Sequence, residues 1–564
     1  MNSSSGFLPL ALVTGQEGPY NLLMRLALAQ IDPTVGAIDD NLGLILSHIE
    51  RAKRAECDLV IFPELAVCGY SPLDLLWRRG FVEKMQEAQE KIRQASAGIG
   101  VIVGGITAQH HHDGENLADP SSISDGAGTD LFNSALFFSD GSLVASVPKL
   151  NLPTFDVYSE RRYFTPGPGA QVVDFRGKSI GINVCEDLWV DDGPTDAQAS
   201  LGAEWIINIS ASPFFVGKGE VRRRLAAHRA RENGITLICA NLVGGQDDIV
   251  FDGGSFITGP DGDLLYQAPS FVEGLFIIDT EKTCPAPTPK QDHITTARQA
   301  IVLGIRDYLR KNGFSRVIIG ISGGIDSALV AALAVEALGR DAVSGVFLPS
   351  DISSQESHDD AHALARNLGI DIIDVSISEV VSSSHAALQQ GITDLAAENL
   401  QARVRGTLLM TLANERNALV LTTGNKSEIA VGYNTLYGDT VGALAPIADL
   451  YKTQVWKMAR GMDGLIPQRI IDKPPTAELR PGQKDEDDLP PYPVLDAILE
   501  QLIEKNASRD DLVARGFPVE TVDDVFARYY RNEYKRRQLP PAIKVSAKAF
   551  GSGRRIPITH RYRS

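Results

Sequence analysis

The sequence predicts an α/β protein with two domains, the first built on a mixed sheet and the second on a doubly wound parallel sheet. Three observations lead to this prediction: a length of 564 residues, apolar runs that alternate with helix-like stretches, and a polar, proline-rich segment near the middle. A chain of this length exceeds what one hydrophobic core supports, so two large domains are expected.

Short apolar, β-branched runs recur through the first half, and each is expected to form a buried strand. These runs are Arg25 to Ile31, Leu59 to Phe62, Gly100 to Ile106, Ser179 to Val184, Trp205 to Ile209 and Ile235 to Ala240. Helix-like stretches such as Asn41 to Glu56 and Phe81 to Ser96 lie between several of them, which indicates layers of helix and sheet. Turn signals at Asp140-Gly141 and Asp261-Gly262-Asp263 predict hairpins, and therefore antiparallel neighbours in a mixed sheet.

The proline-rich segment from Glu281 to His293 marks the predicted domain boundary. We expect an extension outside the fold at residues 1–23, a first domain at 24–283, a linker at 284–294 and a second domain at 295–564. The expected order in the second domain is helix Thr295 to Lys311, strand Val317 to Ile321, helix from Asp326, strand Ala342 to Leu348, helix from Ser357 and strand Ile370 to Ile377. Such alternation predicts parallel strands joined by helical crossovers.

Two polar stretches are expected to form loops. Gln109 to Asp130 is rich in Gly and Ser, while Lys473 to Pro493 combines prolines with an acidic cluster and is long enough to act as a lid. The histidines at 110–112 fall in the first loop without metal-ligand partners nearby in the sequence, so no zinc site is assigned to them.

Composition limits the class of protein. A formal charge of −17 argues against a nucleic-acid or anionic-membrane coat, and an anionic substrate would need local cations. The five cysteines stand singly at positions 57, 68, 185, 239 and 284, which fits a reducing, cytoplasmic compartment. No apolar stretch approaches the length of a membrane span, so a soluble enzyme is expected.

Three reactive side chains end or follow apolar runs in the first half: Glu64, Lys149 and Cys185. A charged group at the end of a buried strand is held rigidly and partly desolvated, which raises the basicity of a carboxylate. Together these residues suffice for amide cleavage: Cys185 attacks the carbonyl, Glu64 moves the thiol proton to the leaving ammonia and Lys149 stabilises the oxyanion.

In this order, the three residues and their neighbours resemble the nitrilase, or carbon-nitrogen hydrolase, superfamily from Met24 to Asp279. The resemblance implies an αββα sandwich. The segments Glu186-Asp187-Leu188-Trp189 and Ser210-Ala211-Ser212-Pro213-Phe214 are similar to the glutamine-using branch, which implies that Glu186 and Ser212 grip the α-amino end of glutamine. Tyr70 and Glu160 are further candidates for this site.

In the second half, Ile318 to Ser327 reads as a strand, a small-residue turn and the start of a helix. Glycine amides, the Ser322 and Ser327 hydroxyls and a helix N-terminus together bind oxyanions. The motif lacks the Gly-Lys-Ser/Thr of a Walker A loop. It resembles the pyrophosphate loop of the N-type ATP pyrophosphatases, which release pyrophosphate and leave AMP on an oxygen of the substrate.

Later segments resemble NAD synthetases in particular: Glu398 to Arg403, Thr422 to Glu428, Tyr437-Gly438-Asp439, Lys473 to Leu479 and Asn532 to Arg537. The resemblance implies ATP contacts at Gly320, Ile321, Ser322, Gly323, Gly324, Ile325, Asp326, Ser327, Thr423, Lys452 and Thr476. It implies Mg²⁺ on Asp326 and Glu428, and deamido-NAD contacts at Arg403, Glu428 and Lys535. Leu436 stands where shorter, ammonia-dependent relatives carry a lysine, so that contact to the dinucleotide is in doubt.

The implied activity is that of a carbon–nitrogen ligase with glutamine as nitrogen donor. Its substrates are glutamine, ATP and deamido-NAD, its products include NAD, AMP and pyrophosphate, and an internal ammonia tunnel and a homo-oligomer are expected. Two alternatives remain at this point: a glutamine-dependent synthetase for another carboxylate, and a carbon-nitrogen hydrolase whose second half only senses nucleotides.

Overall fold

The computed structural model describes residues 24–78, 80–110, 129–280, 286 and 292–562. The chain divides into two compact units, Met1–Gln246 with Phe251–Lys290 and Asp247–Val250 with Gln291–Ser564. The expectations for residues 1–23, Cys284, His111 and His112, and most of the first loop and the linker lie outside the described residues. No helix in the described ranges is long and apolar enough to cross a membrane.

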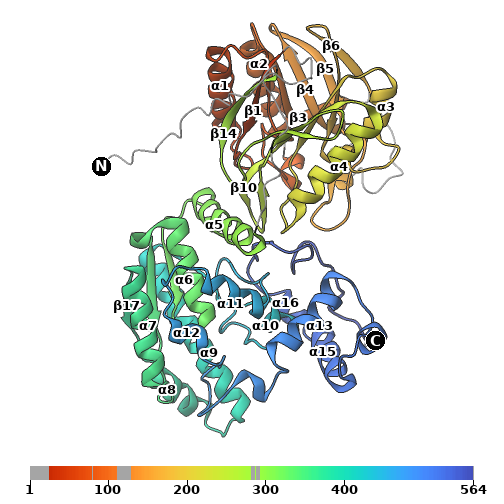
Figure 1. The fold of residues 1–564 in the computed structure, drawn as a ribbon. Coiled ribbons are helices and arrows are strands. Elements are labelled where there is room, and N and C mark those ends of the chain that lie inside the picture. The colour runs from red at the N-terminus through yellow and green to blue at the C-terminus, as the bar shows by residue number, and fades with distance from the viewer. Residues whose placement is uncertain (1–23, 79, 111–128, 281–285, 287–291, 563–564) are drawn as a thin grey trace, which may run out of the picture. The chain divides into compact units, whose positions relative to one another are not determined.

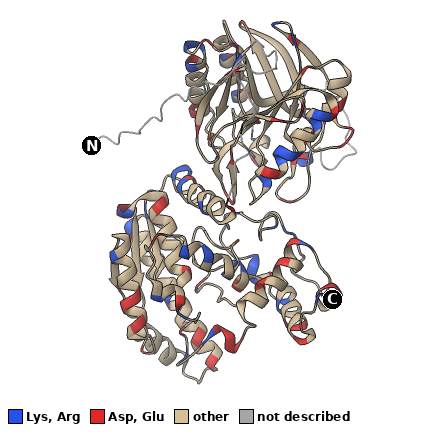
Figure 2. Ribbon diagram, viewed as in Figure 1, with Lys and Arg blue, Asp and Glu red and all other residues tan. Residues whose placement is uncertain are grey.

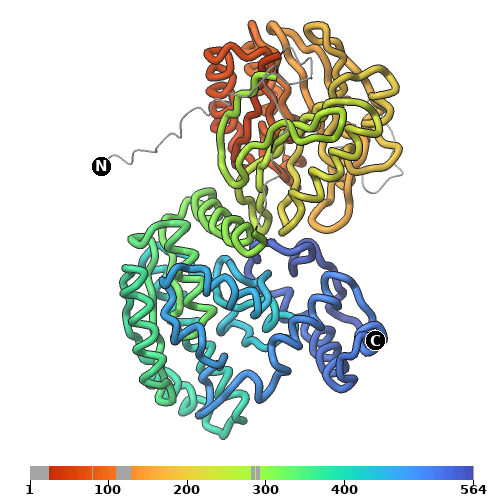
Figure 3. The backbone as a smooth tube through the Cα atoms, in the orientation of Figure 1, coloured from red at the N-terminus to blue at the C-terminus, as the bar shows by residue number. Residues whose placement is uncertain are grey.

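Unit 1 contains two six-stranded sheets, and the run of the chain through them can be followed in Figure 3. The first has the order β14-β1-β2-β3-β4-β5, from Gly274–Asp279, Arg25–Gln30, Leu59–Ile61, Gly100–His110, Thr129–Ser139 and Ser142–Pro148. The second has the order β13-β12-β9-β8-β7-β6, from Leu264–Gln267, Phe256–Thr258, Thr236–Asn241, Trp205–Ser210, Lys178–Val184 and Val172–Phe175. A separate pair is formed by β10 (Val243–Gln246) and β11 (Ile249–Asp252).

The inner faces of these sheets share one core, which contains Leu28 and Ile61 from the first sheet and Ile182 and Ile209 from the second. Helices α1 (Ile38–Arg54) and α2 (Phe81–Ala95) cover the first sheet, and α3 (Pro194–Ser200) and α4 (Lys218–Asn233) cover the second (Figure 1). The predicted αββα sandwich is therefore confirmed.

Both sheets of unit 1 are mixed, as the turn signals predict. Strands β1, β2 and β3 run parallel, whereas β4 and β5 pair antiparallel through a two-residue turn at Asp140-Gly141. Both turn residues have positive φ, 49° and 74°, which matches the twist of a tight hairpin.

Unit 2 is built on one parallel sheet with the order β17-β16-β15-β18, from Asp371–Asp374, Val343–Phe347, Val317–Gly320 and Leu419–Val420. The crossover helices are α6 (Ile325–Leu338), α7 (Gln355–Leu368), α8 (Ser378–Leu388) and α9 (Asp394–Arg416), with α5 (His293–Lys311) preceding the sheet. Side chains of α9 pack with Ile318 and Val346 in one core. The predicted doubly wound sheet is confirmed.

The chain after β18 adds a helical region with its own core around Leu495, Leu499 and Phe526. Its helices are α10 (Lys426–Val431), α11 (Lys452–Arg460), α12 (Gln468–Asp472), α13 (Tyr492–Glu504), α14 (Arg509–Ala514), α15 (Val519–Arg531) and α16 (Glu533–Arg536). Charged residues of both signs fall mainly on the helices and loops of each unit, while the strands carry few (Figure 2). This distribution leaves buried charges as exceptions that need partners.

Candidate active sites

In unit 1 the structure brings the three strand-end residues together. Glu64 lies just beyond β2, Lys149 directly follows β5 and Cys185 directly follows β7. All three are buried. The Lys149 ammonium donates to Glu64 Oε1 at 2.8 Å and to Glu160 Oε1 at 2.7 Å. A buried cation held between two buried carboxylates forms a rigid cluster, because breaking any one contact leaves an unpaired charge.

Charge and burial set the protonation of this cluster. Burial favours the neutral amine of Lys149, but Glu160 and Glu64 outweigh it and raise the Lys149 pKa well above its usual range. Burial raises the pKa of the Cys185 thiol well above its usual value, and the charge of Glu64 raises it further. This shift favours the protonated thiol, so a nucleophilic role for Cys185 would require a base that accepts its proton.

Glu64 is the candidate for that base, since its charge acts on the Cys185 thiol. Its Oε1 also accepts from Asn133 Nδ2 at 2.7 Å, and its Oε2 accepts from the backbone N–H of Ala211 at 2.7 Å. These contacts fix the carboxylate in orientation. Sequence reasoning did not select Asn133, since it lies within an ordinary apolar strand, β4, and carries no local motif.

Glu160 and Tyr70 form the other side of the cluster. The Tyr70 hydroxyl donates to Glu160 Oε1 at 2.9 Å. Burial raises the pKa of Glu160 to about 7, although Lys149 lowers it. Glu160 Oε2 also accepts from Asn133 Nδ2 at 3.4 Å, so Glu160 contacts Lys149, Tyr70 and Asn133, which suits a residue that positions Lys149.

The turn that carries Cys185 is organised by Asp187, which sequence reasoning also did not select. Cys185 has a positive φ of 47° and begins a 3-10 helix, Cys185–Leu188. The Asp187 carboxylate accepts from the backbone N–H groups of Val184 at 3.1 Å, Leu150 at 3.1 Å and Asn151 at 2.8 Å. Asp187 therefore ties the nucleophile turn to the loop behind Lys149.

Glu186 and Ser212, the two residues expected to hold glutamine, differ in how their surroundings affect them. Burial raises the pKa of Glu186 above its usual value. Ser212 is buried, and its hydroxyl makes no hydrogen bond within the described part of the chain. A buried hydroxyl without a partner costs free energy unless a ligand satisfies it.

In unit 2 the small-residue loop lies at the topological switch point of the sheet. Strand β15 is followed by the loop and then by α6. Its neighbours in the sheet are β16 on one side and β18 on the other, and β18 comes later in the chain and is followed by Thr422 to Gly424. Open parallel sheets bind ligands where neighbouring strands diverge in this way.

Hydrogen bonds preform this loop. Ser327 Oγ accepts from the Ser322 N–H at 3.2 Å and donates to the Gly324 carbonyl at 3.0 Å, while Ser322 Oγ accepts from the Gly324 N–H at 3.2 Å. Gly323 has φ +78°, and a Cβ there would lie 2.5 Å from the Ser357 carbonyl oxygen. Only glycine fits this position, which explains the second glycine of the motif.

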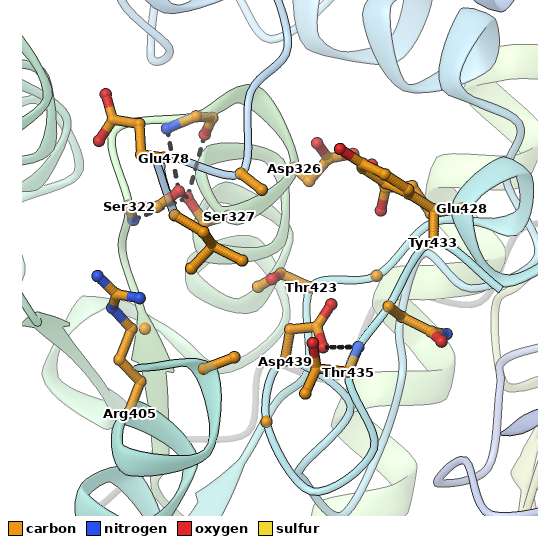
Figure 4. Close-up of a pocket in the computed structure, with 18 of the residues that line it drawn as sticks. Ser322, Asp326, Ser327, Arg405, Thr423, Glu428, Tyr433, Thr435, Asp439 and Glu478 are labelled. Atoms are coloured by element: carbon orange, nitrogen blue, oxygen red, sulfur yellow. Dashed lines mark hydrogen bonds between the residues drawn. The ribbon is translucent and has the colours of Figure 1, made fainter. Parts of the chain in front are cut away.

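A cavity of 810 Å³ opens above the loop. It is lined by all the expected ATP and dinucleotide residues except Gly323: Gly320, Ile321, Ser322, Gly324, Ile325, Asp326, Ser327, Arg403, Thr423, Glu428, Lys452, Thr476 and Lys535. Figure 4 shows Asp326 and Glu428 on one side of the cavity and Arg405 on the other, with Thr423 between them.

The acidic side of the cavity holds one ammonium between two carboxylates. Lys452 Nζ contacts Asp326 and lies 3.1 Å from Glu428 Oε1, and Asn425 Nδ2 donates to Asp326 Oδ1 at 2.9 Å. Burial raises the pKa of Glu428 to about 8, with Lys452 opposing this shift. Asp485 from the acidic segment adds a third nearby carboxylate, which sequence reasoning did not select.

Comparisons with known proteins agree with both halves of this geometry. Residues 25–284 match the carbon-nitrogen hydrolase family and residues 297–540 match the NAD synthase family. A glutamine-dependent NAD(+) synthetase of a Synechocystis strain is 41% identical, over 96% of this chain and 99% of its own length. The chain belongs to the glutamine-dependent NAD(+) synthetases. The family's enzyme from Acinetobacter baylyi is 40% identical over 96% of this chain and 99% of that protein.

Among solved structures, a glutamine-dependent NAD(+) synthetase from Acinetobacter baumannii in complex with ADP is 37% identical, with a TM-score of 0.74. The alignment covers 95% of this chain and 98% of that one. Membership of the glutamine-dependent NAD(+) synthetases thus extends over both units.

The cationic residues assigned to the dinucleotide lie on the same cavity. Lys535 Nζ donates to the backbone carbonyls of Gly432 at 2.7 Å and Asn434 at 2.6 Å, and Arg403 Nε donates to that of Leu436 at 3.2 Å. Leu436 also lines the cavity. Neither cation is held by a carboxylate in these contacts.

Arg405 and Asn434 line the cavity and were also not selected from the sequence. Arg405 is half-buried, and desolvation lowers its pKa to about 10, with Glu478 opposing. The side-chain amide of Asn434 makes no hydrogen bond among the described residues. Unsatisfied donors and acceptors in a synthetase cavity of this size are matched by a polar ligand.

The segment expected to act as a lid forms one wall of this cavity, with Lys473 to Arg480 among the lining residues. Glu478 accepts from Ser354 Oγ at 3.0 Å and from Ser357 Oγ at 2.6 Å, at the start of α7. Lys473 Nζ donates to Ser357 Oγ at 2.7 Å. Lid movement itself stays a prediction.

Proposed function

We propose that this chain makes NAD from deamido-NAD, ATP and glutamine, with unit 1 releasing ammonia and unit 2 consuming it. The observation that carries the proposal is the presence, in one chain, of a buried Cys–Lys–Glu centre and of a preformed oxyanion loop beside an acidic pair. The buried Cys–Lys–Glu centre is suited to cleaving amides. The oxyanion loop is suited to holding the pyrophosphate that ATP releases.

In unit 1, Glu64 accepts the Cys185 proton as the sulfur attacks the glutamine side-chain carbonyl, and returns it to the departing ammonia. Lys149, fixed by Glu64 and Glu160, stabilises the negative oxygen that develops. Water then cleaves the thioester to glutamate, with Glu64 again as base. Ser212 and Glu186 hold the amino-acid end of the substrate.

In unit 2, the loop from Gly320 to Ser327 holds the phosphates of ATP, with Thr423, Lys452 and Thr476 along the nucleotide. The carboxylate of deamido-NAD, positioned by Arg403 and Lys535, attacks the α-phosphorus and releases pyrophosphate. Ammonia then displaces AMP to form the amide. The loop stabilises the charge that develops on the departing pyrophosphate, and adenylation turns a poor leaving oxygen into AMP, which ammonia can displace.

We also propose a Mg²⁺ site on Asp326 and Glu428. The residues fit this ion: two carboxylates share one ammonium, and Asp485 lies close enough to raise the Glu428 pKa. Such an all-oxygen set with surplus negative charge suits a hard divalent cation. When bound, Mg²⁺ would neutralise charge that develops on the phosphates.

The decisive test offers the purified enzyme nicotinic acid adenine dinucleotide, ATP, Mg²⁺ and glutamine. We expect NAD, AMP, pyrophosphate and glutamate in equal amounts. ATP binding without AMP formation would instead indicate a nucleotide-sensing hydrolase. If another carboxylate were amidated and deamido-NAD were not, the assignment of substrate would be wrong.

We further propose that ammonia reaches unit 2 without mixing with the solvent, since ammonium is not nucleophilic. With unlabelled glutamine and ¹⁵N-ammonium present together, NAD should carry mainly the glutamine nitrogen. Full exchange with the label would contradict the tunnel. A homo-oligomer and a cytoplasmic setting complete the proposal, and light scattering tests the former.

A further inference from the structure

A cluster outside both sites combines two histidines and a carboxylate. His358 and His362 are one turn apart on α7, and Asp374 ends the neighbouring strand β17. One ligand atom from each residue lies within 4.8 Å of the others. Neither the ligase reaction nor the Mg²⁺ site uses these residues.

The atoms are spaced as metal ligands are. Asp374 Oδ2 lies 3.2 Å from His358 Nε2, and Asp374 Oδ1 lies 3.0 Å from His362 Nε2. In a tetrahedral zinc site, bond lengths of about 2.0–2.2 Å place neighbouring ligand atoms roughly 3.3 Å apart. A small rotation of the side chains would therefore admit an ion among them.

The outer contacts of His358 are compatible with an ion at Nε2. Without an ion, a neutral His358 with its proton on Nε2 would donate to Asp374, and its bare Nδ1 would accept from Gln355 Nε2 at 3.3 Å, with Asp359 Oδ1 also 3.4 Å away. With a metal on Nε2, Nδ1 carries the proton and donates to Asp359. A carboxylate behind a metal-bound imidazole is the usual arrangement. Gln355 Nε2 donates to the same Asp359 oxygen at 2.9 Å and so holds it in place.

Packing orients the two rings. The centroids of His358 and His362 lie 4.3 Å apart, and the Phe347 ring packs edge-on against both, at 5.4 and 6.5 Å. Both imidazoles are half-buried and Asp374 is exposed. The rings are thus held toward one carboxylate while one side remains open to solvent, which leaves room for water as a further ligand.

We propose that His358, His362 and Asp374 form a binding site for one zinc-class divalent cation, distinct from the Mg²⁺ site. Imidazole nitrogens select zinc, nickel, copper or cobalt over Mg²⁺, which prefers oxygen. The site joins β17 to α7, and Ser357, next to His358, lines the nucleotide cavity.

The test titrates Co²⁺, a spectroscopic substitute for zinc, into the full chain purified without a polyhistidine tag, with excess Mg²⁺ to occupy oxygen sites. We expect one Co²⁺ per chain with visible d–d absorption, displaced by Zn²⁺. His362→Ala and Asp374→Asn should each weaken binding at least tenfold, and Asp359→Asn should weaken it by about tenfold.

Two controls locate the ion. His385→Ala removes an exposed histidine on α8 and should leave Co²⁺ binding unchanged. Replacing His110, His111 and His112 by alanine tests another source of imidazole. This change should also leave Co²⁺ binding unchanged, because the proposed site does not use these residues. Each variant is first checked for NAD formation, which shows that it is folded. Stoichiometric binding that survives His362→Ala and Asp374→Asn, or absent binding in the wild type, would overturn the proposal.

Discussion

The two candidate sites differ in how far their polar groups are satisfied before substrate arrives. In unit 1, Lys149 pairs with both Glu64 and Glu160 in a buried cluster. In unit 2, an 810 Å³ cavity keeps Asn434 without a partner and two carboxylates share one ammonium. The difference follows from the ligands: a small amide needs a rigid nucleophile, whereas two large anions supply many of the missing contacts themselves.

The sharpest test of this comparison separates the two chemistries. Cys185→Ala should lower glutamine-dependent NAD formation by at least ~10³-fold, because no other group can form the thioester. Activity with ammonium salt should persist, since unit 2 is untouched. Cys57→Ala, which alters a cysteine away from the cluster, should retain both activities. Loss of the ammonium-dependent rate in Cys185→Ala would show that the sites are not separable.

The converse change is made in the unit 2 loop. Gly323→Ala places a Cβ against the Ser357 backbone and should lower NAD formation with either nitrogen donor by at least ~100-fold, because small displacements of reacting groups are costly. Gly313→Ala is the matched control: its φ is +77°, but no atom lies within 4 Å of the added Cβ. It should cost only about 1 kcal/mol of stability. Equal activities in the two variants would argue against a preformed phosphate loop.

A smaller effect tests whether the unpartnered Ser212 hydroxyl of unit 1 binds the substrate. Ser212→Ala should raise the KM for glutamine about tenfold while leaving the free energy of unfolding unchanged or higher by about 1 kcal/mol, because an unpartnered hydroxyl is removed. Ser210→Ala is the contrast, since Ser210 Oγ donates to Asn208 Oδ1 at 2.6 Å. Its loss should lower stability by about 1 kcal/mol. Kinetics and thermal unfolding measure both variants.

The smallest effect concerns pH. The pKa of Glu160 is about 7 in the folded protein and 4.5 in its ordinary state, so the folded protein binds the proton more tightly. The stability gained from this tighter proton binding is therefore fully present below pH ~4.5 and is lost as pH rises through ~7. The free energy of unfolding falls by at most about 3 kcal/mol over this range. Glu160→Gln should flatten the fall in Tm between pH 5 and 8. An unchanged slope would show that Glu160 stays ionised throughout.

Much of both sites was predictable because their residues lie next to regular elements. Glu64, Lys149 and Cys185 stand at or near the ends of apolar runs, and strand ends in a layered fold converge on one edge. The unit 2 loop was predictable for a related reason: its small residues, hydroxyls and helix start are contiguous in the chain. The family resemblance added the order of the later segments, and the full-length relatives agree with it.

The sequence by itself determined the two α/β units and the strand–turn–helix form of the Gly320 to Ser327 loop, because each depends on local patterns of hydrophobicity and glycine. Tertiary structure alone decided that Asn133 orients Glu64, that Asp187 braces the Cys185 turn, and that Asp485 joins the acidic pair. Burial and the nearby charge of Glu64 also raise the pKa of the Cys185 thiol well above its usual value. These properties depend on burial and on charges brought together from distant parts of the chain, which no local pattern records.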